Sequence, residues 1–241
     1  MQNRKLRSYT RRNLRRTLLS VFLSNLSVTS WLILANVVFF VVAMIFLLIY
    51  GEQVFNYIAL RPVDIIQGKY LWTFLTSMFM HAGFLHLFIN MFVLFSLGSF
   101  CEKIIGRKRF FWFYIISGLV AGGLFVLLAG LYGEGEFGAR VFGSVLIPAV
   151  GASGAIFAIA GLFMILLPKL KFSIIFLPFF SLPAYIMIPL VLFLTWGVSA
   201  GTGLPLGNTA HFGGFMAGVI YGLYLRKKYS RKVARLNRMI H

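Results

Sequence analysis

Acidic residues are scarce in this sequence. Only 5 of its 241 residues are Asp or Glu, whereas 23 are Lys or Arg, so the formal net charge is +18. In a soluble protein such an excess would suggest nucleic-acid binding. Here the cations occur in blocks between uncharged apolar runs, and 60% of the residues are hydrophobic, a composition outside the range of soluble domains. We therefore expect an integral membrane protein with no nucleic-acid partner.

Other features that the sequence lacks exclude further classes. The single cysteine, Cys101, excludes a disulfide within the chain. No HExxH motif is present, and no Asp or Glu falls within an apolar run. A zinc hydrolase built on His81, His86 and His211 is therefore a poor alternative. We expect neither a metal nor another cofactor.

The apolar runs predict an all-α membrane protein with six transmembrane helices. A span needs about 20 apolar residues, and the first run has no small-x-small cleavage site after it, so we expect it to remain as a span. The loop at 51–70 and the apolar stretch 172–183, which contains two prolines, are expected at the membrane surface, and 132–144 is expected to be a loop. The predicted spans are residues 31–50, 82–100, 110–131, 148–167, 184–199 and 209–225.

Basic residues predict the orientation of these spans. The amino-terminal arm, the loops after spans two and four, and the carboxy-terminal tail hold 20 of the 23 cations, whereas the opposite loops hold four of the five acids. Excess Lys and Arg marks the cytoplasmic side, so both termini should be cytoplasmic. The predicted organisation is a basic arm at 1–30, lying against anionic headgroups, a six-span domain at 31–225 and a basic tail at 226–241.

Three polar side chains fall at similar depth near the outer ends of spans two, four and six. They are His86, Ser153 and His211, with Ser153 placed about 8 Å below the start of its span at 1.5 Å per residue. Polar ionisable groups inside a membrane are costly and are functional candidates. Gly214, Gly218 and Gly222 follow His211 on one helix face, which predicts close packing against the small residues 151–161 of span four. His211 should then lie within hydrogen-bond reach of Ser153.

This arrangement predicts nucleophilic catalysis by a Ser153–His211 dyad. A serine hydroxyl needs a base to take its proton, and no carboxylate lies in a span to complete a triad. A tetrahedral oxyanion needs preorganised donors. The Ser153 N–H at a helix start is one, and the side chains of His86 and Asn90, one helical turn apart, are the others we expect.

These residues resemble those of the rhomboid intramembrane serine proteases over about residues 31–225. The similarity lies in HAGFLHLFIN at 81–90, in Gly151-Ala152-Ser153-Gly154, and in Ala210-His211 followed by glycines. The resemblance implies a six-helix rhomboid-type bundle in the cell membrane, with a water-filled cavity open to the extracytoplasmic side. It also implies cleavage of transmembrane protein substrates near their outer ends.

The sequence departs from the family pattern at two positions. Trp72 is followed by Thr73 where many members have Trp-Arg, and Phe157 stands where many have tyrosine four residues after the nucleophile. Phe157 can still stack on His211 but cannot donate a hydrogen bond. His81 is interpreted as a structural hydrogen-bonding residue.

Two further alternatives remain. A catalytically inactive rhomboid-like protein that binds membrane helices is disfavoured because both Ser153 and His211 are present. A channel or transporter is disfavoured because neither repeated halves nor charged pathway residues are visible. For substrate entry, the short span five suggests an opening at its outer end, with Phe193 and Trp196 closing the gap to span two.

Overall fold

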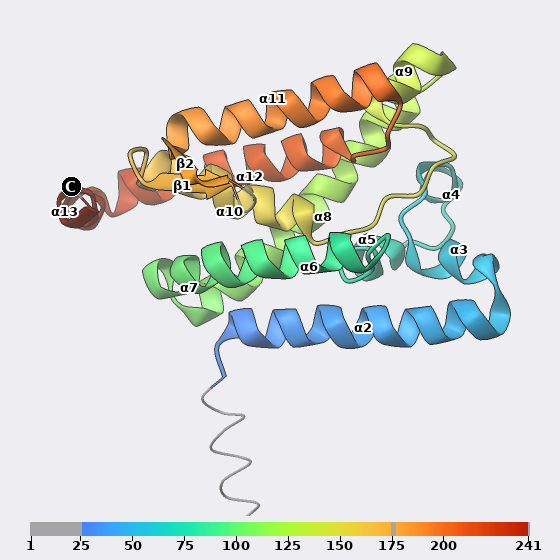
Figure 1. The fold of residues 1–241 in the computed structure, drawn as a ribbon, viewed down its shortest axis with the longest axis horizontal. Helices are drawn as coiled ribbons and strands as arrows, with labels where there is room; N and C mark the ends of the chain where they lie inside the picture. Colours follow the sequence, from blue (N-terminus) through green and yellow to red (C-terminus); the bar gives the residue numbers. More distant parts are fainter. Residues whose placement is uncertain (1–25, 175–176, 241) are drawn as a thin grey trace, which may run out of the picture.

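The computed structural model describes residues 26–174 and 177–240 and is mostly helical. The predicted interaction of the basic arm with headgroups falls largely on residues outside this range. Most of the long helices have roughly parallel axes, whereas α8 (Arg107–Tyr132) crosses them obliquely (Figure 1). Helix α2 (Val28–Tyr50) lies on one side of the bundle, α11 (Ala184–Thr202) on the other and α10 (Ser153–Leu166) between them.

A helix is present at each of the six predicted spans. The second begins at Phe84, after Gly83, and continues through a π-helical turn without interruption. The six are α2 (Val28–Tyr50), α6 (Phe84–Val93) with η2 (Leu94–Gly98) and α7 (Ser99–Ile105), α8 (Arg107–Tyr132), α10 (Ser153–Leu166), α11 (Ala184–Thr202) and α12 (Asn208–Lys228).

Four helices in the described residues are long and apolar enough to cross a membrane, which confirms a multi-span protein by length and composition. They are α2, the continuous helix Phe84–Ile105, α8 and α11. The other two predicted spans differ from these. α10 is apolar but has only 14 residues. α12 has 21 residues, and its polar first turn, four glycines and basic last turn lower its hydropathy.

Shorter elements connect the long helices. The first connection contains η1 (Glu52–Val54), α3 (Phe55–Ile58), α4 (Pro62–Ile66) and α5 (Thr73–Thr76). The expected loop at 132–144 instead contains α9 (Gly135–Phe142), which ends at Gly143 with a φ of 94°. The tail forms α13 (Ser230–Ile240). The expectation of a loop at 132–144 was therefore wrong.

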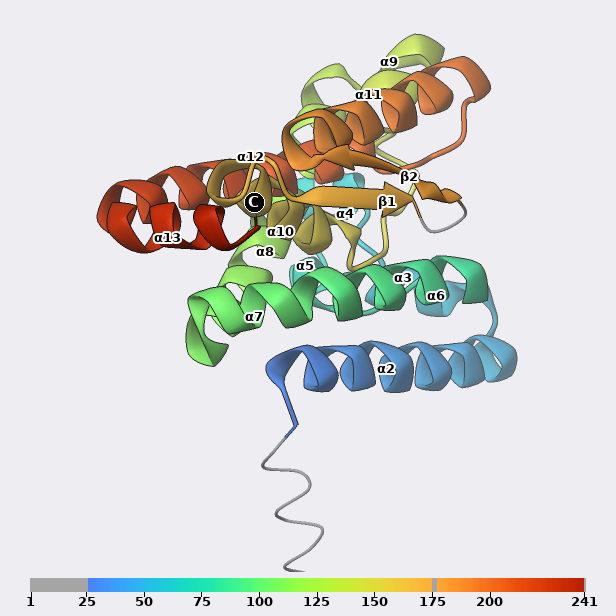
Figure 2. The same cartoon turned by 60° about the vertical axis from the view of Figure 1, so that its left-hand side comes forward.

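The expectation of an all-α protein was wrong at one place. Strands β1 (Lys171–Ile174) and β2 (Leu177–Pro183) form an antiparallel hairpin in which Phe172 pairs with Leu182 and Ser173 with Ser181. Proline disfavours a helix interior, and the alternation of polar and apolar residues in Lys171–Ile174 suits a strand. Figure 2 shows the hairpin between α11 and the α6–α7 helix.

The start of α2 is fixed by a carboxylate from another helix. Glu102 in α7 accepts hydrogen bonds from the backbone N–H groups of Val28 and Thr29, at 2.9 Å each, and from the Thr29 hydroxyl at 2.8 Å. These N–H groups have no partner within their own helix. A buried acid therefore satisfies them and joins α2 to α7.

The proposed closure by Phe193 and Trp196 against span two does not match the structure. The Trp196 indole N–H donates to the Val141 carbonyl of α9 at 2.8 Å, and its ring packs 5.9 Å from that of Phe212 in α12. Phe193 is 77% exposed. Trp196 therefore ties α11 to α9 and α12 rather than to α6.

Glycines bring α10 and α12 into backbone contact, which confirms the predicted pairing of span six with span four. A Cβ atom on Gly214 would lie 1.9 Å from the Gly154 carbonyl oxygen, and one on Gly218 would lie 2.0 Å from that of Ala158. At Gly222 the distance to the Ile165 Cβ would be 2.9 Å. These contacts leave no space for a side chain along this face of α12.

We expect Gly218→Ala to lower stability, because the added methyl must push the two helices apart. Overpacking of this kind costs about 1–3 kcal/mol, measured as a lower thermal unfolding midpoint in detergent. Gly123→Ala in α8 is the matched control, since a Cβ there would meet nothing within 4 Å. Equal midpoints for the two variants would contradict the close packing of α10 and α12.

Candidate active site

Ser153 is the first residue of α10, which agrees with the expected helix start at the serine, but the helix begins five residues later than the predicted span limit at 148. Four residues earlier, the backbone of Ala149 forms an isolated β-bridge with that of Leu60 through hydrogen bonds of 2.8 and 3.0 Å. Gly151 then has a φ of 130°, which favours glycine. Its N–H donates to the Ser77 carbonyl at 2.9 Å. The serine therefore follows a turn that is fixed by the first connecting segment.

The helix start leaves backbone donors free beside the Ser153 hydroxyl. The N–H of Ile156 donates to the Ala152 carbonyl at 3.1 Å. The N–H groups of Ser153, Gly154 and Ala155 precede that bond and have no acceptor within α10. The partial positive charge of a helix amino terminus adds to this environment. These free donors and the partial positive charge suit an anionic oxygen near the Ser153 hydroxyl.

His211 lies in the first turn of α12 and meets Ser153 across the glycine contact. Its Nε2 atom is 2.8 Å from the Ser153 Oγ atom. Gly207, with a φ of 64°, precedes the helix, and its carbonyl accepts from the His211 N–H at 3.0 Å. The hydrogen-bond reach predicted from spacing is therefore present.

The imidazole of His211 is held by packing and not by a carboxylate. Its ring stacks on that of Phe157, with centroids 4.5 Å apart and planes 29° apart. Phe157 is one turn beyond Ser153 on α10. The Nδ1 atom of His211 is buried, and the described residues provide it with no hydrogen-bond partner. The arrangement is thus a pair, with an aromatic ring orienting the histidine.

His86, in the first turn of α6, lies on the other side of Gly151. A Cβ on Gly151 would be 3.0 Å from His86 Cε1, 3.1 Å from His86 Nε2 and 3.5 Å from Ser153 Oγ. The Nδ1 atom of His86 accepts from the Ala82 N–H at 3.3 Å. A neutral imidazole with this bond carries its proton on Nε2. The proton therefore lies on the ring nitrogen nearer to Gly151.

Asn90 is next to this group but is not bonded to the dyad. It is 5% exposed, and its side-chain amide donates to the His86 carbonyl at 2.9 Å. The hydrogen bonds of the described residues include none between Asn90 and Ser153 or His211. One amide hydrogen is thus engaged in α6, and the second is free to bind another acceptor.

His81 packs as an aromatic ring. It is fully buried, and its ring lies edge-on to those of His86, at 5.1 Å, and Phe40, at 6.4 Å. Neither ring nitrogen has a hydrogen-bond partner among the described residues. The described residues therefore do not support the expected hydrogen-bonding role of His81.

Sequence reasoning missed the backbone groups that shape the site. The Ser77 carbonyl holds Gly151, the Ala82 N–H sets the tautomer of His86, and the Leu60–Ala149 pairing fixes the turn. Backbone groups carry no residue-type signal. Only Gly151, within the small-residue motif, could have suggested a special backbone conformation.

Comparison with known proteins supports the resemblance. Residues 68–228 match the Rhomboid domain. The chain is 34% identical over 166 residues to Rhomboid protein 1, mitochondrial, of Saccharomyces cerevisiae, covering 66% of this chain and 43% of that protein. It is 34% identical over 160 residues to RHOMBOID-like protein 5 of Arabidopsis thaliana, covering 66% and 46% respectively.

A human protein is also similar. The chain is 30% identical over 151 residues to Presenilin-associated rhomboid-like protein, mitochondrial, of Homo sapiens, covering 62% of this chain and 37% of that protein. The chain spans less than half the length of each of these relatives. Because the Rhomboid domain match covers most of the sequence, the chain belongs to the rhomboid family and is a multi-pass membrane protein.

Proposed function

We propose that this protein is an intramembrane serine protease that cleaves transmembrane segments of membrane proteins near their outer ends. The observation that carries the proposal is the 2.8 Å approach of His211 Nε2 to Ser153 Oγ. Family membership supports it, because rhomboid proteins are generally serine intramembrane proteases and act on membrane-protein substrates.

The chemistry follows from the roles of the two side chains. Ser153 Oγ attacks the carbonyl carbon of the scissile peptide while His211 Nε2 takes the hydroxyl proton. The new C–O bond gives a tetrahedral oxyanion. As the C–N bond breaks, His211 returns the proton to the leaving amine, and an acyl-enzyme remains. His211 then takes a proton from a water molecule as the water oxygen attacks the ester carbon. When the bond between that carbon and Ser153 Oγ breaks, His211 returns the proton to Oγ and the new carboxyl terminus leaves.

The oxyanion would be stabilised by donors on both sides of Gly151. We assign the Ser153 N–H, the His86 Nε2–H and the Asn90 amide to this role. His86 and the Ser153 hydroxyl both lie against Gly151, which supports the first two. Asn90 would contribute its second amide hydrogen.

We further propose the topology and the domain limits. All six helices cross the membrane, with residues 1–30 and 226–241 cytoplasmic and the six-span domain at 31–225. The site faces the extracytoplasmic side, and the cell membrane is the proposed location. The charge distribution supports this orientation, because the connections at the end of the molecule that carries α3, α4 and α9 hold only three of the 23 cations.

The alternative is an inactive rhomboid-like protein that binds membrane helices. It has the same fold and differs only in turnover. Purified protein, with a fluorogenic transmembrane substrate and with or without a chelator, separates the two. Cleavage that resists the chelator supports the serine mechanism.

Removal of either dyad member should abolish cleavage. We expect Ser153→Ala and His211→Ala each to lower turnover by roughly 10,000-fold or more, and the double variant to be little worse, because the two act as a unit. Ser96→Ala, at an exposed serine of the α6–α7 helix, is the control and should retain the wild-type rate. Substantial cleavage by Ser153→Ala would rule out this nucleophile.

Loss of one oxyanion donor should have a smaller effect. His86→Ala and Asn90→Ala are each expected to lower kcat by roughly 10- to 1,000-fold, with unfolding midpoints measured to verify the fold. His81→Phe is the comparison, because it replaces a buried ring that makes no hydrogen bond to the residues that the structure describes, and it should change kcat only slightly. Wild-type rates in both donor variants would show that His86 and Asn90 serve the fold alone.

A further inference from the structure

Three cations converge on one aromatic ring where α8, α12 and α13 meet. The Arg109 guanidinium carbon lies 5.5 Å from the Tyr229 ring centroid, and the Nζ atoms of Lys228 and Lys232 each lie 5.7 Å from it. Arg109 also donates to the Tyr229 hydroxyl at 3.2 Å. These distances are within the range of cation–π attraction. We refer to Arg109, Lys228, Lys232 and Tyr229 as the Tyr229 cluster.

Among the described residues, no carboxylate forms an ion pair with this cluster. Four of the five acids are in the connections around η1, α4 and α9, at the other end of the molecule (Figure 1). The fifth, Glu102, accepts from the first turn of α2, and its nearest cation is Arg107 at 3.6 Å. Three like charges around one ring repel each other, and an anion bound between them would offset this repulsion.

The cluster is held in place by the docking of α13. Val233 is buried, and the Asn237 side chain donates to the Leu166 carbonyl at the end of α10, at 2.8 Å. Asn237 also donates to the Val233 carbonyl one turn earlier, at 2.9 Å. Lys232 is adjacent to Val233, so its backbone position is fixed by these contacts.

An apolar wall begins directly beside the cluster on α8. Trp112 and Ile116 follow Arg109 by three and seven residues, on one helix face, and both are exposed.

The wall continues on α12. Tyr224 and Ile220 precede Lys228 by four and eight residues and are also exposed. The Lys228 Nζ atom donates to the Tyr224 hydroxyl at 2.7 Å and lies 5.2 Å from its ring centroid, so Tyr224 joins the wall to the cluster. A stack of Phe113 on Tyr221, with centroids 5.0 Å apart, joins the two helices. A cationic site therefore caps a membrane-facing apolar surface.

We propose that the Tyr229 cluster binds the headgroup of an anionic phospholipid of the cytoplasmic leaflet. The phosphodiester oxygens accept hydrogen bonds from Arg109, Lys228 and Lys232, and the acyl chains lie along the α8–α12 wall. The wall favours a lipid over a free phosphate, because only an amphiphile fills both parts. This site is separate from the dyad and does not depend on proteolysis.

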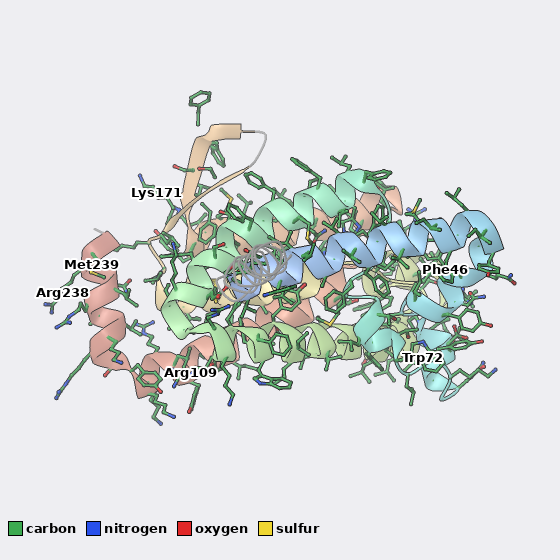
Figure 3. The ribbon with its side chains drawn as sticks, turned by 90° about the horizontal axis from the view of Figure 1, so that it is seen from below. Phe46, Trp72, Arg109, Lys171, Arg238 and Met239 are labelled. Atoms are coloured by element: carbon green, nitrogen blue, oxygen red, sulfur yellow. The ribbon has the colours of Figure 1, made fainter. Side chains whose placement is uncertain are left out.

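The remaining cations of α13 provide a contrast. Arg231, Arg235 and Arg238 are on the same helix and are exposed, but they do not converge on a ring. Figure 3 shows Arg238 on α13, well away from Arg109 at the start of α8. Removing these arginines changes the net charge as much as removing the cations of the cluster.

The test uses the full chain purified in dodecyl maltoside micelles with dilute dioleoylphosphatidylglycerol or dioleoylphosphatidylcholine, and counts bound lipid by native mass spectrometry. We expect retention of the phosphatidylglycerol in preference to the phosphatidylcholine. The triple variant Arg109→Gln, Lys228→Gln, Lys232→Gln should bind phosphatidylglycerol about 100-fold more weakly, from a loss of about fivefold for each cation.

The control is the triple variant Arg231→Gln, Arg235→Gln, Arg238→Gln, which should retain binding within about threefold because dilute lipid creates no surface potential. If the first triple variant aggregates, Lys228→Gln and Lys232→Gln alone should each weaken binding by about fivefold. Equal losses in both triple variants, or equal retention of the two lipids, would overturn the proposal. If inorganic phosphate displaces the lipid and binds as tightly as the lipid does, the assignment to a phospholipid would be overturned.

Discussion

The separation of Ser153 from His211 depends on how closely the backbones of α10 and α12 approach. The side chains of Ser153 and His211 can reach each other across two helices only when the helix axes are unusually close. The contacts of Gly214 and Gly218 with the carbonyl groups of Gly154 and Ala158 provide that approach. In lipid no hydrophobic drive brings helices together, so small residues are what permit such contact. The close packing of α10 against α12 therefore also sets the distance between Ser153 and His211.

The remaining parts of the site are positioned by a different kind of interaction. Gly151 is held by Ser77, and Ala149 pairs with Leu60, so the first connecting segment fixes the turn before α10. His86 comes from α6 and contacts Gly151 from the other side. Three separate parts of the chain thus meet at one glycine. A side chain at position 151 would fill the space between the His86 ring and the serine hydroxyl.

Periodic patterns in the sequence predicted the contact between α10 and α12. The glycine stripe after His211 indicated a close neighbour, and the small residues after Ser153 identified it, which the structure confirms. The features that were missed have no period. The turn before α10 depends on the single pair of hydrogen bonds between Leu60 and Ala149 and on the conformation of Gly151.

Two other elements were missed for related reasons. The hairpin at 171–183 lies in a stretch where prolines exclude a helix without specifying a strand pair. α9 contains glycines, which weaken any helical signal. The pairing of Trp196 with Val141 also joins segments 55 residues apart, and no local pattern records such a contact.

The shortness of α10 has a geometric consequence for substrates. Fourteen residues extend only about 21 Å, whereas the hydrocarbon layer is about 30 Å thick. The inner end of α10 is followed by Pro168 and Lys169, which favour the inner boundary. Ser153 then lies about 9 Å below the outer boundary, a depth of about six helical residues. In the proposed proteolysis, this depth corresponds to a peptide bond about six residues inside the substrate's membrane segment, so the length of α10 would set the position of cleavage.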